Sequence, residues 1–163
     1  MTISPDQLYH EDFYAWTRHQ AEALRRLAET RLNTGIDLEH LIDEVEDLGS
    51  ERLFSVLSQT ERLIEHLLKL EFSPAAYPRQ GWLRTVDGAR WELARRLTSA
   101  IRNQLEAELP ELYAHAAKSA ARDLRQHGEA EAAAALPATC PYSLDRLLDQ
   151  DWYPASRHGF VDE

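Results

Sequence analysis

The longest apolar pattern in the sequence covers residues 50–72. At 100° per residue, seven aliphatic side chains fall in one broad arc: Leu53, Val56, Leu57, Leu63, Ile64, Leu67 and Leu68. An arc of this width is typical of a helix that faces a protein core. We therefore predict a central helix here, with His66 beside its apolar arc.

Further stripes with the same period predict helices over residues 13–31, 38–48, 81–109 and 112–135, and Ser143 is expected to begin a short helix through Leu148. Gly49 and Ser50 are expected to form a tight turn, so that the helix before them and the central helix make an antiparallel hairpin. Pro110 is expected to break or kink the chain. No stretch alternates with the period of a strand. The predicted fold is an all-α, single-domain helical bundle of about five helices plus a short C-terminal helix.

The length of 163 residues fits one domain, residues 1–163. Its core is expected over about residues 10–136, followed by a loop and short helix over 137–154 and a loose tail over 155–163. No run of about 18 apolar residues occurs, and residues 1–5 lack the pattern of a secretion signal. The lone Cys140 cannot form an internal disulfide. These features predict a cytoplasmic protein without a membrane partner.

The net charge of -10 opposes nonspecific attraction to nucleic acids. Acidic residues are densest over residues 37–51, which contain no Lys or Arg: Asp37, Glu39, Asp43, Glu44, Glu46, Asp47 and Glu51. We expect this segment to be a solvated face whose carboxylates pair with arginines, the candidates being Arg25, Arg26, Arg95 and Arg96. No nucleic-acid partner is expected.

A metal site is the first chemical hypothesis for these carboxylates, because carboxylates and imidazoles on helices bind divalent ions. His40 and Glu44 are one turn apart, but Glu46 projects to the other flank of the same stripe. Rise along the predicted hairpin also separates His66 from Glu44. We therefore predict no metal site and no cofactor.

Large aromatic residues form the second candidate set: Tyr14, Trp16, Trp82, Trp91 and Trp152. Aromatic residues at helical spacing belong to a core or line a pocket. Trp91 projects away from its helix's apolar face and is therefore a candidate interface anchor.

Arg90 falls within the apolar arc of residues 81–109, between Leu83 and Leu97 in projection. A buried guanidinium must be paired or must line a cavity. Equal rise from the loop after residue 72 places Arg90 level with His66. We predict a polar cluster of Arg90 and His66 with at least one carboxylate and with Gln20 as an addition, the carboxylate candidates being Glu44, Glu46, Glu61 and Glu65. Structural pairing and an anion-binding or catalytic pocket both remain open.

Ordered blocks of residues resemble a bacterial family known as domain of unknown function number twenty-nine. They are Asp12-Phe13-Tyr14-Ala15-Trp16 with Gln20; Asp37-Leu38, Asp43-Glu44-Val45-Glu46 and Leu48-Gly49; His66-Leu67-Leu68-Lys69; Trp82 and Arg90; and Pro141-Tyr142-Ser143-Leu144 with Pro154. The resemblance implies a compact all-helical fold and supplies no substrate.

Nothing in the sequence indicates a nucleophilic enzyme, because its serines occupy cap or loop positions and Cys140 has no recognisable base. We therefore expect a helical binding or assembly protein with a protein partner or with self-association. The alternative is a metal-dependent or acid-base enzyme centred on Glu44, Glu46, His66 and Arg90. An exposed apolar patch would favour binding, whereas a concave site around these polar groups would favour an enzyme.

Overall fold

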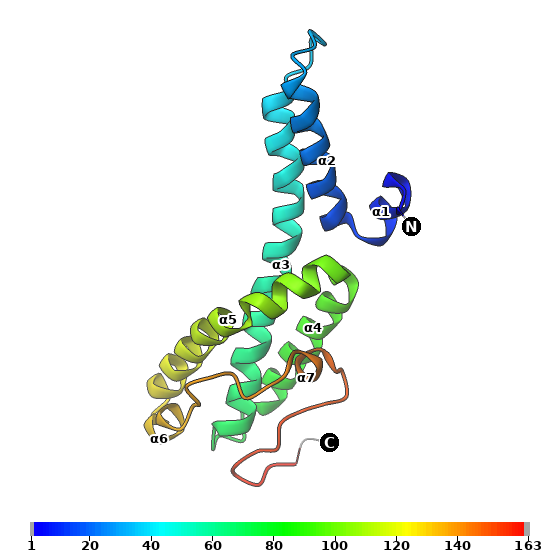
Figure 1. Cartoon of the computed structure of the whole chain (residues 1–163). Helices are drawn as coiled ribbons and strands as arrows, with labels where there is room; N and C mark the ends of the chain where they lie inside the picture. The colour runs from blue at the N-terminus through cyan, green and yellow to red at the C-terminus, as the bar shows by residue number, and fades with distance from the viewer. Residues whose placement is uncertain (1, 162–163) are drawn as a thin grey trace. The chain divides into compact units, whose positions relative to one another are not determined.

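The computed structural model describes residues 2–161, which form helices and no strands (Figure 1). The helices are α1 (Pro5–Glu11), α2 (Phe13–Glu29), α3 (Leu38–Phe72), α4 (Arg79–Arg96), α5 (Ser99–Gln126), α6 (Ala130–Ala134) and α7 (Leu144–Leu148). The predicted all-α class is therefore confirmed. None of the helices in residues 2–161 is long and apolar enough to cross a membrane.

The chain divides into two compact units. Unit 1 contains Met1–Ser55 and Leu97–Gln104, and unit 2 contains Val56–Arg96 and Leu105–Glu163. The helices α3 and α5 each contribute residues to both units. Each unit is described by itself below.

The predicted turn at Gly49 and Ser50 is wrong, because α3 continues through both residues. A methyl carbon added at Gly49 would lie 2.2 Å from Oγ1 of Thr17 on α2. Gly49 therefore allows α2 and α3 to approach each other closely, and the chain does not reverse direction there. The hairpin of unit 1 consists of α2 and the first half of α3, which run side by side (Figure 1).

The single helix predicted over residues 81–109 is also wrong, because the chain leaves the helical conformation at Leu97 and Thr98. Oγ1 of Thr98 accepts a hydrogen bond of 3.3 Å from the N–H of Ile101 and so caps α5. Helix α5 continues through Pro110, and the break expected there is absent. The break in the helix therefore lies at Leu97 and Thr98, where a hydroxyl caps the next helix, and not at Pro110.

One buried carboxylate joins the ends of two helices in unit 1. Oδ1 of Asp12 accepts a hydrogen bond of 3.0 Å from the N–H of Ala15, at the start of α2. Oδ2 of the same residue accepts one of 2.9 Å from the N–H of Ala100, at the start of α5. Asp12 thereby satisfies donors that both helix N-termini leave free and fixes the start of α5 against α2.

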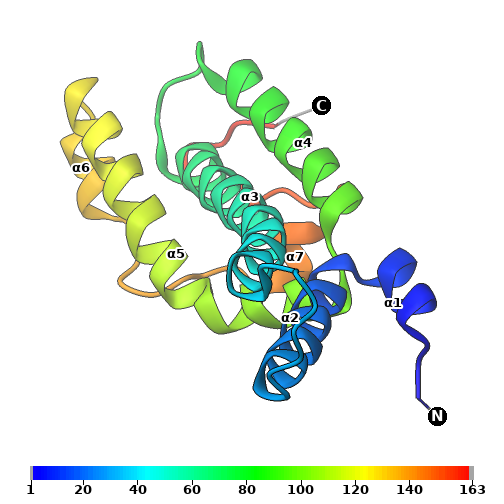
Figure 2. The same ribbon diagram turned by 90° about the horizontal axis from the view of Figure 1, so that it is seen from above.

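The core of unit 2 is formed by the second half of α3, with α4 and α5 beside it (Figure 2). Leu63, Ile64, Leu67 and Leu68 are completely buried, as the apolar arc predicts. The segment after α7 returns to the end of α3, where the N–H of Arg157 donates to the carbonyl of Glu71 at 2.9 Å. Nε2 of His158 also lies 3.0 Å from the carbonyl oxygen of Phe72, so the segment expected as a loose tail is attached to α3 at residues 157 and 158.

Candidate functional site

The hairpin of unit 1 exposes a row of apolar side chains along α3. Leu41 and Leu48 are 40% and 49% exposed, and Val45 between them is half-buried. Their spacing of four and then three residues places them on one flank of the helix. The guanidinium of Arg52, which projects on the same flank, lies 4.2 Å from the ring centroid of Phe13 on α2. The apolar flanks of α2 and α3 therefore lie on the same side of the hairpin.

The flank of α2 on that side is apolar as well, and its side chains are half-buried: Phe13, Trp16, Leu24 and Leu27, with Gln20 among them. The rings of Phe13 and Trp16 stack with centroids 5.5 Å apart, and Tyr9 of α1 meets both edge-on. We call Phe13, Trp16, Leu24, Leu27, Leu41, Val45 and Leu48 together the apolar surface.

Carboxylates border the apolar surface along α3. Glu44, Asp47 and Glu51 project next to Leu41 and Leu48, and all three side chains are exposed. None of the three forms an ion pair within residues 2–161, whereas Glu46, on the opposite flank, is bonded to Arg25 of α2. We call Glu44, Asp47 and Glu51 the acidic edge.

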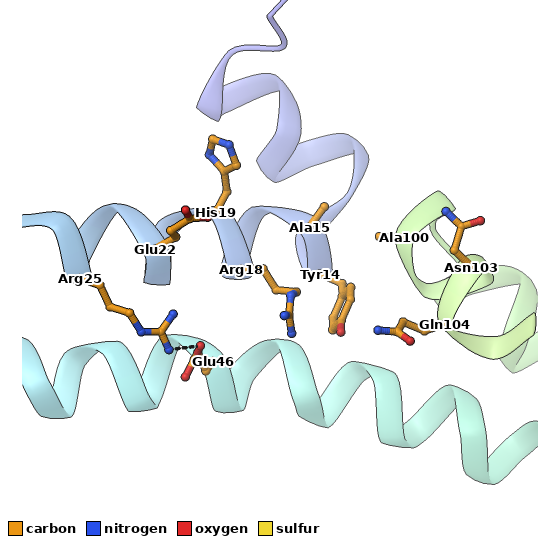
Figure 3. Close-up of a pocket in the computed structure, with 10 residues that line it drawn as sticks. All are labelled: Tyr14, Ala15, Arg18, His19, Glu22, Arg25, Glu46, Ala100, Asn103 and Gln104. Atoms are coloured by element: carbon orange, nitrogen blue, oxygen red, sulfur yellow. Dashed lines mark hydrogen bonds and ion pairs between the residues drawn. The ribbon is translucent and has the colours of Figure 1, made fainter. Parts of the chain in front are cut away.

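The opposite flank of the hairpin forms a polar groove with a volume of about 520 Å³ (Figure 3). Its lining residues come from α2, α3 and the first residues of α5: Tyr14, Ala15, Arg18, His19, Glu22, Arg25, Glu46, Ala100, Asn103 and Gln104. The sequence predicted Tyr14 and Glu46 as site residues, but it placed them in an aromatic pocket and in a cluster around Arg90.

Arg90 of unit 2 is buried as expected, with 2% of its surface exposed, but its partners differ from the predicted ones. Its Nε donates to the carbonyl of Leu147 at 2.9 Å, and its Nη2 donates to the carbonyl of Arg146 at 3.2 Å. The ring of Tyr153 lies 5.1 Å from its guanidinium carbon, and the Tyr153 hydroxyl bonds the carboxylate of Asp87. Burial lowers the pKa of Arg90 from its ordinary value. Arg90 thus holds α7 and the segment after it against α4.

The predicted cluster around Arg90 is therefore corrected. Within the described residues of unit 2, no hydrogen bond or ion pair joins Arg90 to His66, Glu61 or Glu65. His66 instead shares a hydrogen bond of 2.8 Å between Nδ1 and the carbonyl of Arg62. Glu44, Glu46 and Gln20 belong to unit 1, whereas Arg90 and His66 belong to unit 2. The physical reason is that α7, far along the chain, supplies the acceptors that Arg90 needs.

The buried cation near His66 is Lys69, which sequence reasoning missed. Lys69 is 5% exposed, and its Nζ lies 2.8 Å from Oε1 of Glu65 and 2.6 Å from Oδ2 of Asp123. Burial opposes its charge, but the two hydrogen bonds outweigh burial and raise the pKa of Lys69. Lys69 in turn lowers the pKa of Asp123. The i, i+4 spacing of Glu65 and Lys69 beside fully apolar positions was the available signal.

The candidate aromatic residues divide between the two units. Tyr14 and Trp16 lie in unit 1, where Tyr14 lines the polar groove and Trp16 belongs to the apolar surface. In unit 2, the ring of Trp82 lies 6.0 Å from Nζ of Lys69 and lines a second cavity of about 480 Å³. Trp91 is exposed, with the guanidinium of Arg95 over its ring at 4.4 Å.

Groups for metal or nucleophilic chemistry are not assembled in the described part of the chain. Among residues 2–161, no three His, Cys, Asp or Glu side chains are placed to hold a metal ion. Cys140 donates to the carbonyl of Tyr142 at 3.3 Å, and burial raises the pKa of its thiol. A raised pKa leaves less of the reactive thiolate.

Comparisons with known proteins agree with the fold and add no activity. The chain is similar to a protein from Rhodospirillum rubrum ATCC 11170, whose crystal structure is described as that of an alpha-helical protein of unknown function. The TM-score is 0.77 at 26% sequence identity, over 88% of this chain and 90% of that one. No curated protein matches the chain. The family model described as domain of unknown function DUF29 matches residues 8–153, and the chain is therefore a member of that family, as its residue blocks predict.

Proposed function

We propose that this protein binds a partner protein by accepting a basic, amphipathic helical segment on the apolar surface of unit 1. The observation that carries the proposal is the combination of that surface with the acidic edge beside it. Each feature alone is common on protein surfaces. Because they lie side by side on one hairpin, they favour a binding partner that is both apolar and positively charged.

The apolar surface has the form that helix recognition uses. Two neighbouring helices present apolar side chains at spacings of three and four residues, and a third helix can place its own apolar face between them. Leu41, Val45 and Leu48 supply one side, while Trp16 and Leu27 supply the other. Leucine side chains left half exposed in such a row gain free energy when a partner covers them.

The charges favour a basic partner over a second copy of this chain. Residues 38–55 hold six carboxylates and one arginine, and the whole chain carries a net charge of -10. A second copy would bring the same excess of negative charge, whereas lysines or arginines would be attracted to the acidic edge. Glu44, Asp47 and Glu51 have no ion pairs within residues 2–161 and would pair with such residues. The same edge opposes binding to nucleic acids.

The setting proposed for this activity is the bacterial cytoplasm. The half-buried thiol of Cys140 fits a reducing compartment. Self-association remains the alternative occupant, and the experiment below separates it from the proposed one.

The test uses a designed 18-residue peptide with leucines on one helical face and lysines on the other, labelled with a fluorophore. Anisotropy should show binding of this peptide to the full chain and much weaker binding of the same peptide with glutamates in place of lysines. Leu48→Glu should abolish binding. Phe54→Glu is the matched control, because Phe54 is 63% exposed and projects from a different face of α3.

Three results would overturn the proposal. Equal binding of the lysine and glutamate peptides would remove the role of the acidic edge. Equal loss with Leu48→Glu and Phe54→Glu would remove the apolar surface as the site. Sedimentation that shows a dimer which Leu48→Glu dissociates would replace the basic partner by a second copy.

A further inference from the structure

We propose that the polar groove of unit 1 binds a small molecule through a single carboxylate group, which Arg18, Tyr14 and Gln104 hold. The groove lies on the other flank of the hairpin from the apolar surface and has a volume of about 520 Å³ (Figure 3). The inference is therefore independent of the partner helix proposed above. Its basis is a set of hydrogen-bond donors for which residues 2–161 supply no acceptor.

Arg18 supplies the uncompensated charge of the groove. The other charged lining residues are already paired, Arg25 with Glu46 and Glu22 with Arg26, the latter at 3.2 Å. Arg18 forms no ion pair within residues 2–161, and its contact is the ring of Tyr14, 5.9 Å from the guanidinium carbon. A guanidinium stays charged and offers parallel N–H groups that match the two oxygens of a carboxylate.

Tyr14 supplies a hydroxyl on a fixed ring. The residue is 5% exposed, yet within residues 2–161 its hydroxyl forms no hydrogen bond, although the side chain lines the groove. A hydroxyl that opens onto a groove without a partner among the described residues can donate to an external acceptor such as a carboxylate oxygen. A methyl carbon added at Gly49 would lie 3.5 Å from the ring carbon Cδ2 of Tyr14, which shows how closely α3 supports this ring.

Gln104 supplies the third donor from a different helix. Figure 3 shows its side chain, with those of Arg18 and Tyr14, directed into the same part of the groove. The first residues of α5 are fixed against α2 by the hydrogen bond of 2.9 Å between the N–H of Ala100 and Asp12. The donors of both helices are therefore held in place before a ligand arrives, and pre-organisation of this kind lowers the cost of binding.

The remaining groups of the groove favour a carboxylate over a phosphate. Glu22 and Glu46 also line the groove, and their charges would repel a phosphate dianion more strongly than a monoanion. The groove is far larger than a carboxylate alone. The body of the ligand would therefore lie along Ala15 and Ala100, and an amide in that body would meet the side chain of Asn103.

The test is a titration of the ¹⁵N-labelled full chain with N-acetylglycine, followed by NMR. The uncharged N-acetylglycinamide is the matched ligand control, and inorganic phosphate is the competing anion. We expect saturable shifts at millimolar N-acetylglycine in the amides of residues 14–18 and 100–104, with weaker effects of the other two compounds. An absence of these chemical-shift changes would contradict the carboxylate site. It would not affect the peptide test of the apolar surface, so the two proposals can fail separately.

Variants assign the binding to the three donors. Arg18→Gln and Tyr14→Phe should each weaken binding by roughly tenfold or more, as expected for a hydrogen bond to a charged group. Arg122→Gln, which removes an exposed arginine of unit 2, should leave binding unchanged. Since Arg18 is exposed, its replacement does not endanger folding. Equal binding of N-acetylglycine and its amide, tighter binding of phosphate, or unchanged binding by both variants would overturn the proposal.

Discussion

Both units of this protein are built from helices, but they differ in how much apolar surface those helices bury. In unit 2, α3 is covered by leucines from its neighbours. The buried cations of this unit, Lys69, Arg79 and Arg90, all have hydrogen-bond partners. Unit 1 has the smaller buried core, formed around Tyr14, Ala21 and Ile42. Yet unit 1 carries seven of the ten exposed large hydrophobic residues found in residues 2–161, and two of them, Leu41 and Leu48, belong to the apolar surface. We therefore expect stability to depend mainly on unit 2, and the recognition proposed above to depend on unit 1.

The largest effect is expected from Lys69→Ala. The change leaves Glu65 and Asp123 without their shared cation, and breaking a buried ion pair costs about 3–5 kcal/mol when one partner is removed. Partial exposure of both carboxylates places the expected loss near the lower end, about 3 kcal/mol. Urea unfolding followed by circular dichroism measures the free energy of unfolding. Lys118→Ala, at an exposed position of the same unit, should change it by less than about 0.5 kcal/mol.

The same unfolding curves test whether residues 1–163 form one domain. We propose a single transition, because α3 and α5 each continue from one unit into the other. Two separate transitions, of which only one moves with Lys69→Ala, would mean that the units unfold independently.

Arg90→Ala should have the next largest effect. The carbonyls of Arg146 and Leu147 lose charged donors, and α7 loses its attachment to α4. We expect a loss of about 2–3 kcal/mol, as hydrogen bonds to charged groups contribute about 1.5–3 kcal/mol. Hydrogen exchange should show α7 opening more than α3. A loss below about 1 kcal/mol would mean that water replaces the guanidinium at these carbonyls.

Gly49→Ala tests the close approach of α2 and α3 in unit 1. The added methyl group overlaps Oγ1 of Thr17, which favours a loss of about 1–3 kcal/mol, while the gain in helix propensity returns about 1 kcal/mol. The net loss should be about 1 kcal/mol. Adding Thr17→Ala makes room for the methyl group, so the two changes should be less than additive. Strict additivity would show that the overlap is relieved elsewhere.

His66 gives the smallest expected effect, a shallow dependence of stability on pH. Burial lowers the pKa of His66 in the folded chain, so the unfolded chain binds a proton more readily. The free energy of unfolding should therefore fall as the pH decreases below the unfolded value of about 6.5. His66→Gln should flatten this part of the profile relative to the unchanged chain. An identical slope in both proteins would assign the dependence to other groups.

Patterns local to one helix predicted much of this molecule. The apolar arc of Leu63, Ile64, Leu67 and Leu68 identified a buried face, and the position of Trp91 outside its own apolar stripe predicted an exposed ring. Glycine and proline were less informative. Gly49 can mark either a helix end or a close helix contact, and only Thr17, 32 positions earlier in the sequence, decides between them.

The candidate sites depended more on pairs that are distant in sequence. Arg90 was predicted to be buried and bonded, but its acceptors lie 56 and 57 residues later, in a short helix whose position no periodicity gives. Leu41, Val45 and Leu48 belong to the apolar stripe that predicted a helix over residues 38–48, but the predicted turn at Gly49 placed this helix in a hairpin with the central helix. The polar groove is lined by residues of α2 and of the first turns of α5. The apolar pattern placed residues 99–104 inside one continuous helix over residues 81–109, so it did not predict a helix start beside α2.

The two hydrogen bonds of Asp12 also bear on the order of events during synthesis. Asp12 is translated 88 residues before Ala100, the second helix end that it bonds. Unit 1 cannot be completed until residues 97–104 have left the ribosome, by which time much of unit 2 has already emerged. In the interval, the apolar surface of the nascent hairpin is exposed. Its polar groove is incomplete, because Asn103 and Gln104 have not yet left the ribosome. On the ribosome, therefore, the helical partner proposed above could engage the chain before the proposed carboxylate ligand could.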